Sequence, residues 1–164
     1  MDWHTSNPNV MVNYKNDLDL TVKFRKLVPE AVTPKYAQDG DAGIDLTATS
    51  FRVTDTFIEF GTGIAVEIPH GHVGLLFPRS SITKSASGVS LKNSVGVIDS
   101  NYRGEILVRF ELPYSAQTGG NIPVVGDKVA QLIVMPYPKV HLEEVQELSD
   151  SNRGQGGFGS TDKK

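Results

Sequence analysis

The sequence predicts an all-β fold of the jelly-roll kind, because short alternating apolar segments recur along the chain and no segment has a long helical period. Leu20, Val22 and Phe24 alternate with polar residues, and the same two-residue period returns in residues 64–68 and 106–112. Such a period is typical of a strand with one buried face. Many short strands joined by turns favour a β-sandwich or barrel, and jelly rolls are the commonest way to build one from a small chain.

Four shorter apolar runs predict further strands. They lie at residues 57–60, 73–77, 124–125 and 129–135, and Gly and Pro turn signals separate them. One such signal is Pro69-His70-Gly71, so we interpret His70 and His72 as turn residues rather than zinc ligands.

The composition limits the classes of function. With 164 residues, of which 38% are hydrophobic, the chain is expected to form one domain with a real core. The absence of cysteine excludes disulfides, thiolate metal sites and thiol nucleophiles. A net charge of −3 offers no overall attraction to nucleic acid. The sequence has neither a membrane-spanning apolar run nor a secretory signal, so we expect no membrane contact and a cytoplasmic location.

Both ends differ from the predicted β domain, which covers residues 20–148. Residues 1–19 are polar with scattered apolar residues, and they form an N-terminal extension that is either disordered or packed as an arm. Residues 149–164 contain four glycines and one large apolar residue, Phe158. This is too little apolar surface to offset the entropy of ordering, so a flexible C-terminal arm is predicted.

The loop at residues 78–84 follows an apolar run and contains a guanidinium, three hydroxyls and an ammonium. Arg79, Ser80 and Ser81 are suited to bind an oxyanion, with free backbone N–H groups adding donors if a serine caps a short helix. On this loop alone, a polar surface turn with an ordinary helix cap is favoured.

Residues 96–105 are predicted to form a strand, a tight turn and a second strand. Asp99 could orient and deprotonate a water molecule, and the Tyr102 ring could pack against a sugar. A turn capped by the aspartate, with a tyrosine facing solvent, explains the same residues equally well.

Asp41 and Asp45 flank Gly43 and could reach a hard cation. Because Mg²⁺ keeps several waters and takes other ligands from substrate phosphates, a sparse protein contribution fits nucleotide chemistry. A turn before a strand explains the two acids without a metal and is favoured in isolation.

The glycine-rich stretch 153–161 could close over an anion, with Arg153 and two hydroxyls as donors and Phe158 stacking on a base. It lacks the Gly-Lys-Ser/Thr ending of a nucleotide triphosphate loop, so a site of that kind is rejected. The alternative is a disordered tail.

Taken together and in order, five segments resemble the five motifs of the trimeric dUTP pyrophosphatase (dUTPase) family. They lie at residues 41–48, 78–81, 93–105, 126–134 and 153–161. The resemblance spans roughly residues 20–161. It implies a jelly-roll subunit, a homotrimer with active sites at subunit interfaces, and Mg²⁺-dependent hydrolysis of dUTP to dUMP and pyrophosphate. This reaction limits uracil in DNA and supplies dUMP for thymidylate synthesis.

The resemblance also implies roles for residues of the first four motifs. Asp99 would activate the attacking water, and Asp45 would hold magnesium through water. Arg79, Ser80 and Gln131 would contact the triphosphate.

For the base and the sugar, the resemblance assigns three residues of the 93–105 segment. Asn93 and backbone near Gly96 would read the uracil edge. Tyr102 would pack under the deoxyribose and exclude a 2′-hydroxyl.

In the arm, the resemblance implies that Phe158 stacks over uracil and that Gly159 contacts substrate. Arg153, Ser160 and Thr161 would bind the γ-phosphate. Closure of this arm would expel water from the site.

The sequence departs from the family at Ser81, which stands where glycine is usual, although Ser81 remains a predicted substrate contact. The stretch from Arg79 to Asn93 is about one residue longer than common, and the connection at residues 114–121 is also slightly extended.

Three alternatives remain beside this reading. A dCTP deaminase shares the fold, but its glutamate aligns with Arg109, which cannot relay protons as a carboxylate does. A non-catalytic jelly-roll module would leave the five motifs unexplained. A protein-binding regulatory role in addition to catalysis has the N-terminal extension as its only hint.

Overall fold

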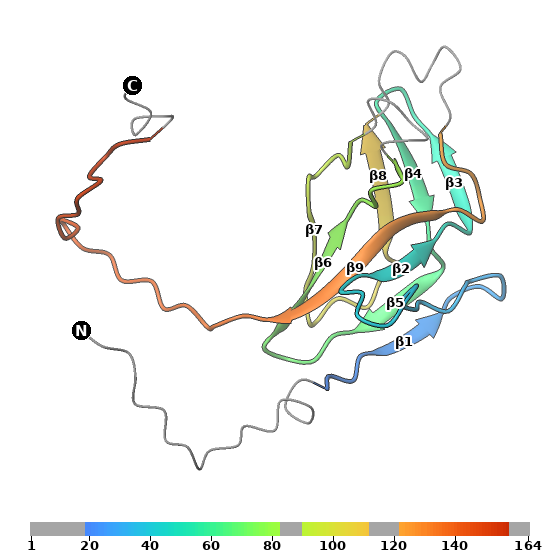
Figure 1. The fold of residues 1–164 in the computed structure, drawn as a ribbon, viewed down its shortest axis with the longest axis horizontal. Helices are drawn as coiled ribbons and strands as arrows, with labels where there is room; N and C mark the ends of the chain where they lie inside the picture. The colour runs from blue at the N-terminus through green and yellow to red at the C-terminus, as the bar shows by residue number, and fades with distance from the viewer. Residues whose placement is uncertain (1–18, 83–89, 112–121, 158–164) are drawn as a thin grey trace.

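The computed structural model describes residues 19–82, 90–111 and 122–157. In this part of the chain nine strands form the body of the molecule (Figure 1). The strands are β1 (Lys23–Lys26), β2 (Ile44–Thr47), β3 (Ser50–Val53), β4 (Phe57–Gly61), β5 (Ile64–Glu67), β6 (His72–Phe77), β7 (Gly96–Ile98), β8 (Leu107–Glu111) and β9 (Lys128–Pro136). The predicted all-β jelly-roll class is confirmed.

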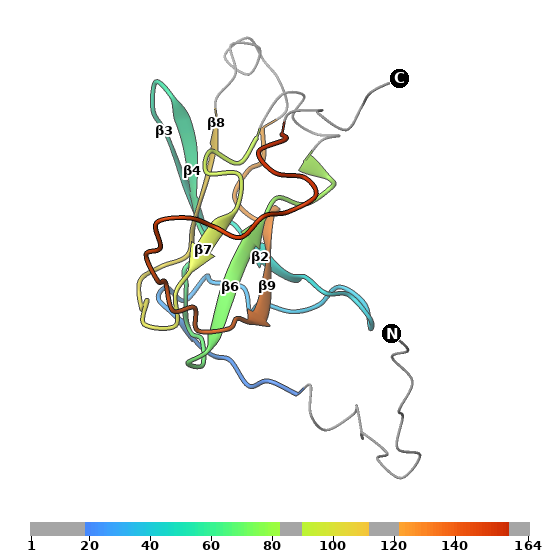
Figure 2. The ribbon, with the colours of Figure 1, turned by 90° about the vertical axis from the view of Figure 1, so that its left-hand side faces the viewer.

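The strands pair antiparallel in three sheets, with the orders β1-β5, β2-β9-β6-β7 and β3-β4-β8. The larger two sheets face each other as layers of a sandwich (Figure 2). Buried side chains from both sheets and from β5 form one core. Its largest members are Phe60, Phe110, Leu46, Ile58 and Ile64. The rings of Phe60 and Phe110 meet edge to face, with centroids 6.1 Å apart, which aromatic pairs prefer.

One of the predicted alternations is confirmed as a half-buried strand, and a second is confirmed in part. In β8, Val108 and Phe110 are buried while Leu107, Arg109 and Glu111 face outward. In β5 and just after it, residues 64, 66 and 68 are buried as the period predicts, but Ala65 on the other face is buried as well. Burial of each large apolar side chain contributes about 1.5–3 kcal/mol, so this register is strongly specified.

The predicted burial of one face of residues 20–25 is confirmed only at Val22, which packs partly buried against the core. β1 forms, but all four of its residues are exposed, and 46% of Phe24 remains accessible. The reason is that β1 pairs with β5 at one edge and lies outside the two main layers. Residues 124–125 are not a strand either, because Val124 and Asp127 bond each other across a turn.

The predicted strand–turn–strand hairpin at residues 96–105 is also corrected. β7 pairs with β6, whereas the next strand, β8, pairs with β4 in the other sheet. The turn therefore carries the chain from one layer to the other. Within the described ranges, no helix is long and apolar enough to cross a membrane.

Candidate active site

Asp45 on β2 is a buried carboxylate that is 8% exposed and lies between two cations. Its Oδ1 is 2.7 Å from Nε of Arg79, and its Oδ2 is 2.7 Å from Nζ of Lys128. The ammonium approaches Oδ2 outside hydrogen-bond geometry, so this oxygen has a counter-ion but no hydrogen bond. A buried carboxylate must be paired to remain charged, and the cluster carries one net positive charge.

The strand register explains how Lys128 reaches Asp45. Asp45 pairs with Gln131, Leu46 with Ala130, and then the register shifts so that Thr47 pairs with Lys128. Val129 and Ala130, which lie at this shift, are both fully buried. The extra residue returns Lys128 to the face of Asp45.

Arg79 follows β6, where Phe77 pairs with Gln131. The Gln131 side chain donates from Nε2 to the carbonyl of Pro78 at 3.1 Å and so lies against this loop. A hollow of about 260 Å³ opens here. It is lined by Ala37, Asp41, Ala42, Gly43, Asp45, Arg79, Ser80, Gln131 and Ile133. The structure thus brings together four residues that the sequence predicted from three separate segments.

Ser81 and Asp41 take different positions around this hollow. Ser81 accepts a hydrogen bond from Nη1 of Arg79 at 3.3 Å and lines a neighbouring hollow together with Lys128. Asp41 accepts the backbone N–H of Gln38 at 2.9 Å, which is the turn before a strand that the sequence favoured. Asp45 alone of the two acids therefore carries the charged cluster.

Asp99 and Tyr102 lie in the turn between β7 and β8, at the far end of β6 from Arg79. Ile98 pairs with Gly74, whereas Arg79 follows the opposite end of the same strand. At the rise of a β-strand, the distance along β6 is roughly 20 Å. Within one chain the structure does not bring Asp99 and Tyr102 to Arg79.

Asn93 and Gly96 lie beside this second region. Asn93 lines a hollow with Lys92, Leu107 and Arg109. Gly96 approaches Leu76 on β6 so closely that a Cβ atom there would lie 2.9 Å from the Cβ of Leu76.

The C-terminal arm leaves the end of β9 and runs away from the sheets (Figure 1). Arg153 lies in a turn of this arm, where its Nε donates to the carbonyl of Gly156 at 2.8 Å. It is far along the arm from the Asp45 cluster of the same chain. Phe158, Gly159, Ser160 and Thr161 lie outside the described residues.

The side chains around the hollow can be compared with those that Mg²⁺ requires. Among the residues described, no group of three or more His, Cys, Asp or Glu could hold a metal ion. Asp45 instead offers one carboxylate, with the Gln131 side chain beside it in the same hollow. These donors fit an ion that keeps its waters and takes direct ligands from phosphate oxygens.

Lys128 was missed by the sequence reasoning. Its position after Gly126 and Asp127 indicates a surface turn, and only the irregular β2–β9 register reveals its contact. The signal that could have found it is the burial of Asp45 on an apolar strand, which requires more than one counter-charge.

The fold and the site together define a β-sandwich protein with a polar hollow, in which Arg79 and Ser80 are donors suited to phosphate anions. The sequence model of the dUTPase family matches residues 29–162. The deoxyuridine 5'-triphosphate nucleotidohydrolase of Rhodococcus erythropolis is 40% identical over 148 residues, covering 87% of this chain and 86% of that protein. Its counterpart in Clostridium kluyveri is 40% identical over 150 residues, covering 88% and 98%.

Solved structures of similar fold are also dUTPases. A dUTPase variant of Staphylococcus bacteriophage 80alpha, determined with dUpNHpp, has a TM-score of 0.74 at 25% identity and covers 86% of this chain and 98% of that one. A variant of the phage phi11 dUTPase, whose structure describes a structural Mg(II) ion, has a TM-score of 0.65 at 25% identity and covers 78% and 98%. The chain belongs to the dUTPase family.

Proposed function

We propose that this chain is a dUTP diphosphatase that hydrolyses dUTP to dUMP and pyrophosphate, with the residue roles given below. The observation that carries the proposal is the convergence of Asp45, Arg79, Ser80 and Gln131 around one hollow, where Asp45 is paired with two cations, Arg79 and Lys128. Membership of the dUTPase family supplies the substrate class.

In the proposed reaction a water molecule attacks the α-phosphorus in line with the departing pyrophosphate. Asp99 accepts the proton of that water as general base. Arg79 and Arg153 offset the charge that develops on the phosphate oxygens, while Ser80 and Gln131 orient the chain of phosphates. A bond forms between the water oxygen and phosphorus, and the bond to the bridging oxygen breaks.

Base and sugar recognition is assigned to the second region. Asn93 and the backbone near Gly96 read the uracil edge, and Tyr102 packs under the deoxyribose. Tyr102 is 41% exposed, so its ring is available to a ligand.

We further propose that the complete site forms between copies of the chain in a homotrimer. The two site regions lie roughly 20 Å apart along β6, too far to act on one nucleotide. The arm also exposes apolar side chains that a neighbouring subunit could cover. They are Val140 (69% exposed), Leu142 (95%), Val145 (51%) and Leu148 (87%). Arg153 and residues 158–161 would then close over a neighbour's site.

Mg²⁺, when bound, would neutralise charge on the phosphates, and Asp45 would hold it through water. The triphosphate would compete with Asp45 for Arg79 and Lys128, which now pair with that carboxylate. Because the substrate is a nucleotide of the cell interior, we propose the cytoplasm as the compartment.

The proposal is tested with the purified protein, Mg²⁺ and each deoxynucleoside triphosphate in turn. We expect pyrophosphate from dUTP alone. Ammonia from dCTP would instead indicate a deaminase, and the absence of any product would indicate a binding module.

Asp99→Asn tests the assigned base. Turnover should fall by ~10²–10⁴-fold while substrate still binds, because a positioned general base typically contributes that much. Full activity in this variant would remove Asp99 from the role.

A further inference from the structure

The turn that carries Asp99 and Tyr102 is held by bonds within itself. The N–H of Tyr102 donates to the carbonyl of Asp99 at 3.1 Å. Nη1 of Arg103 donates to the carbonyls of Ser100 and Tyr102, at 2.7 and 2.8 Å. These bonds fix the backbone on which the tyrosine stands.

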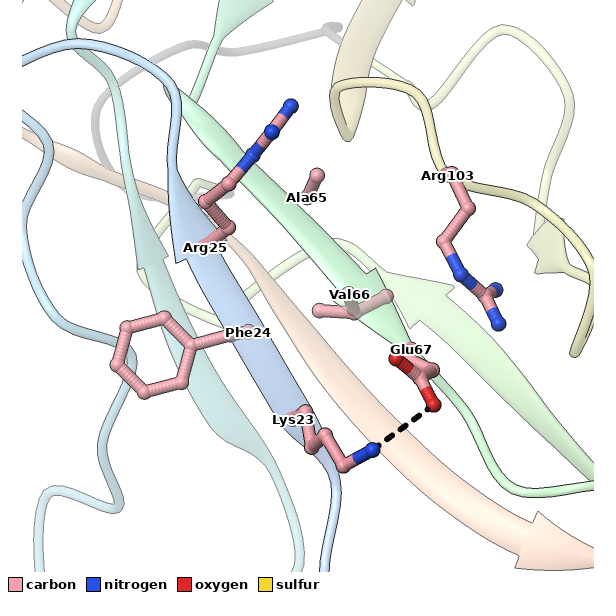
Figure 3. Close-up of a pocket in the computed structure, with 7 residues that line it drawn as sticks. All are labelled: Lys23, Phe24, Arg25, Ala65, Val66, Glu67 and Arg103. Carbon is pink, nitrogen blue, oxygen red and sulfur yellow. Dashed lines mark hydrogen bonds and ion pairs between the residues drawn. The ribbon is translucent and has the colours of Figure 1, made fainter.

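Arg103 lies across a hollow from β1 and β5. Figure 3 shows Arg103 on the other side of β5 from β1, with Glu67 between its guanidinium and Lys23 in this view; Lys23 and Glu67 form an ion pair at 3.2 Å. The C-terminal end of the turn is tied to the start of β5, because the N–H of Gly63 donates to Oε1 of Glu105 at 2.7 Å and the N–H of Ile106 donates to the carbonyl of Ile64 at 2.9 Å.

The Tyr102 ring is fixed at its outer end as well. Its hydroxyl donates to the carbonyl of Glu105 at 2.9 Å, which lays the ring across Gly104. A Cβ atom on Gly104 would lie 2.6 Å from Cζ and 2.9 Å from Cε2 of the ring, and closest of all to the hydroxyl oxygen. Carbon atoms do not approach so closely, since their optimal separation is about 3.5–4.0 Å.

Space is the reason for glycine at this position. Gly104 is not one of the glycines with a positive φ, so its backbone conformation is open to alanine. Any side chain at residue 104 would have to displace the ring and break the bond between the Tyr102 hydroxyl and Glu105.

We propose that Gly104 is a specificity-determining positioning residue, which sets discrimination against a 2′-hydroxyl by letting the Tyr102 ring lie against the turn. This inference rests on the proposed function, in which Tyr102 contacts the deoxyribose. A methyl group at residue 104 lifts the ring away from its bond to Glu105. The ring then no longer fills the space that a 2′-hydroxyl would occupy, and a ribonucleotide can bind.

The test compares kcat/KM for dUTP and UTP in the wild type and in Gly104→Ala. The ratio of the two values should fall by about tenfold, as expected when one shape contact in a binding site is lost. Asn101→Ala is the matched control, because it truncates an exposed side chain in the same turn. Its ratio should equal that of the wild type.

A double-variant comparison separates positioning from general damage. In a Tyr102→Ala background, Gly104→Ala should leave the ratio unchanged, since the ring through which Gly104 acts is gone. Retention of the wild-type ratio by Gly104→Ala alone overturns the proposal. An equal loss of ratio on adding Gly104→Ala to Tyr102→Ala overturns it too.

Thermal unfolding of each variant shows whether it is folded at the assay temperature. If Gly104→Ala is not folded at that temperature, Tyr102→Phe replaces it in the test, because this variant keeps the ring and removes only the bond to Glu105. A ratio a few-fold lower supports the proposal, and an unchanged ratio overturns it. A wild type that hydrolyses neither nucleotide, or a Tyr102→Ala variant with full discrimination, would contradict the proposed function instead.

Discussion

Asp45 and Glu59 are both buried carboxylates held by two cations, but their surroundings differ. Glu59 lies on β4 between Arg52 on β3 and Arg109 on β8, in the order in which those strands pair. Each of its oxygens accepts an N–H from an arginine Nε, at 2.6 and 2.5 Å. Both guanidinium groups also lie over the Phe57 ring, at 5.9 and 5.0 Å from its centroid.

The Glu59 cluster is therefore a brace across three neighbouring strands, with each carboxylate oxygen bonded. At Asp45 the cations come from a loop and from an irregular strand end, one oxygen lacks a hydrogen bond, and a hollow opens beside the group. The comparison teaches that two similar ion clusters can differ in purpose. Complete bonding indicates a structural role, and incomplete bonding beside a hollow indicates partners that can be exchanged for a ligand.

Removing the charge of Asp45 should have the largest effect on catalysis. A small effect would contradict the contrast drawn between Asp45 and Glu59. Asp45→Asn is expected to lower kcat/KM for dUTP by about 10²-fold, the scale of losing a group that orients a metal or charge in a site. Steady-state kinetics measure this, with Glu59→Gln as the matched control at wild-type kcat. A rate near that of the wild type would make Asp45 structural as well.

Lys128 sharpens the comparison, because its ammonium is the exchangeable partner of Asp45. Lys128→Met should lower kcat/KM by about tenfold, mostly through a higher KM, since one charge-assisted contact to phosphate is lost. Lys128→Arg keeps the charge and should retain most of the affinity. An unchanged KM in the Met variant would show that Lys128 serves only to neutralise Asp45.

On the structural side, Glu59→Gln should lower the free energy of unfolding by about 1 kcal/mol, because two charge-assisted bonds are weakened while both arginines remain partly in solvent. Urea unfolding measures the change. Stability equal to that of the wild type would refute the brace.

The smallest expected effect is the pH dependence of the stability that Glu59 contributes. The hydrogen bond from Arg52 holds the pKa of Glu59 below its ordinary value of 4.5; burial opposes this, and Arg109 adds to it. A carboxyl with a depressed pKa adds stability above its unfolded pKa and loses it as pH falls through the folded value. The difference in stability between wild type and Glu59→Gln should thus be constant above about pH 5 and shrink in more acidic solution. A difference that grows on acidification would contradict this assignment.

The sequence could predict a strand whose alternation matches its burial, as in β8, because one face of that strand lies against the core. It could not predict the exposure of β1, since a period of two tells which residues share a face but not whether that face is covered. Nor could local spacing reveal that β7 and β8 belong to different sheets. Strand partners are set by contacts far apart in the chain.

The same limit applies to the site. Asp45, Arg79, Ser80 and Gln131 could be named from their motifs, and the structure gathers them around one hollow. The counter-ion Lys128 could not, because its side-chain direction depends on a single irregular step in the pairing of β2 with β9.

That irregular step makes the stretch 127–131 intolerant of changes in length. Shortening it by one residue would restore a regular ladder and swing the Lys128 side chain toward the apolar interior, where Val129 and Ala130 now lie. Asp45 would then keep only Arg79. Natural and engineered variants of this chain are thus expected to accept substitutions here far more readily than insertions or deletions.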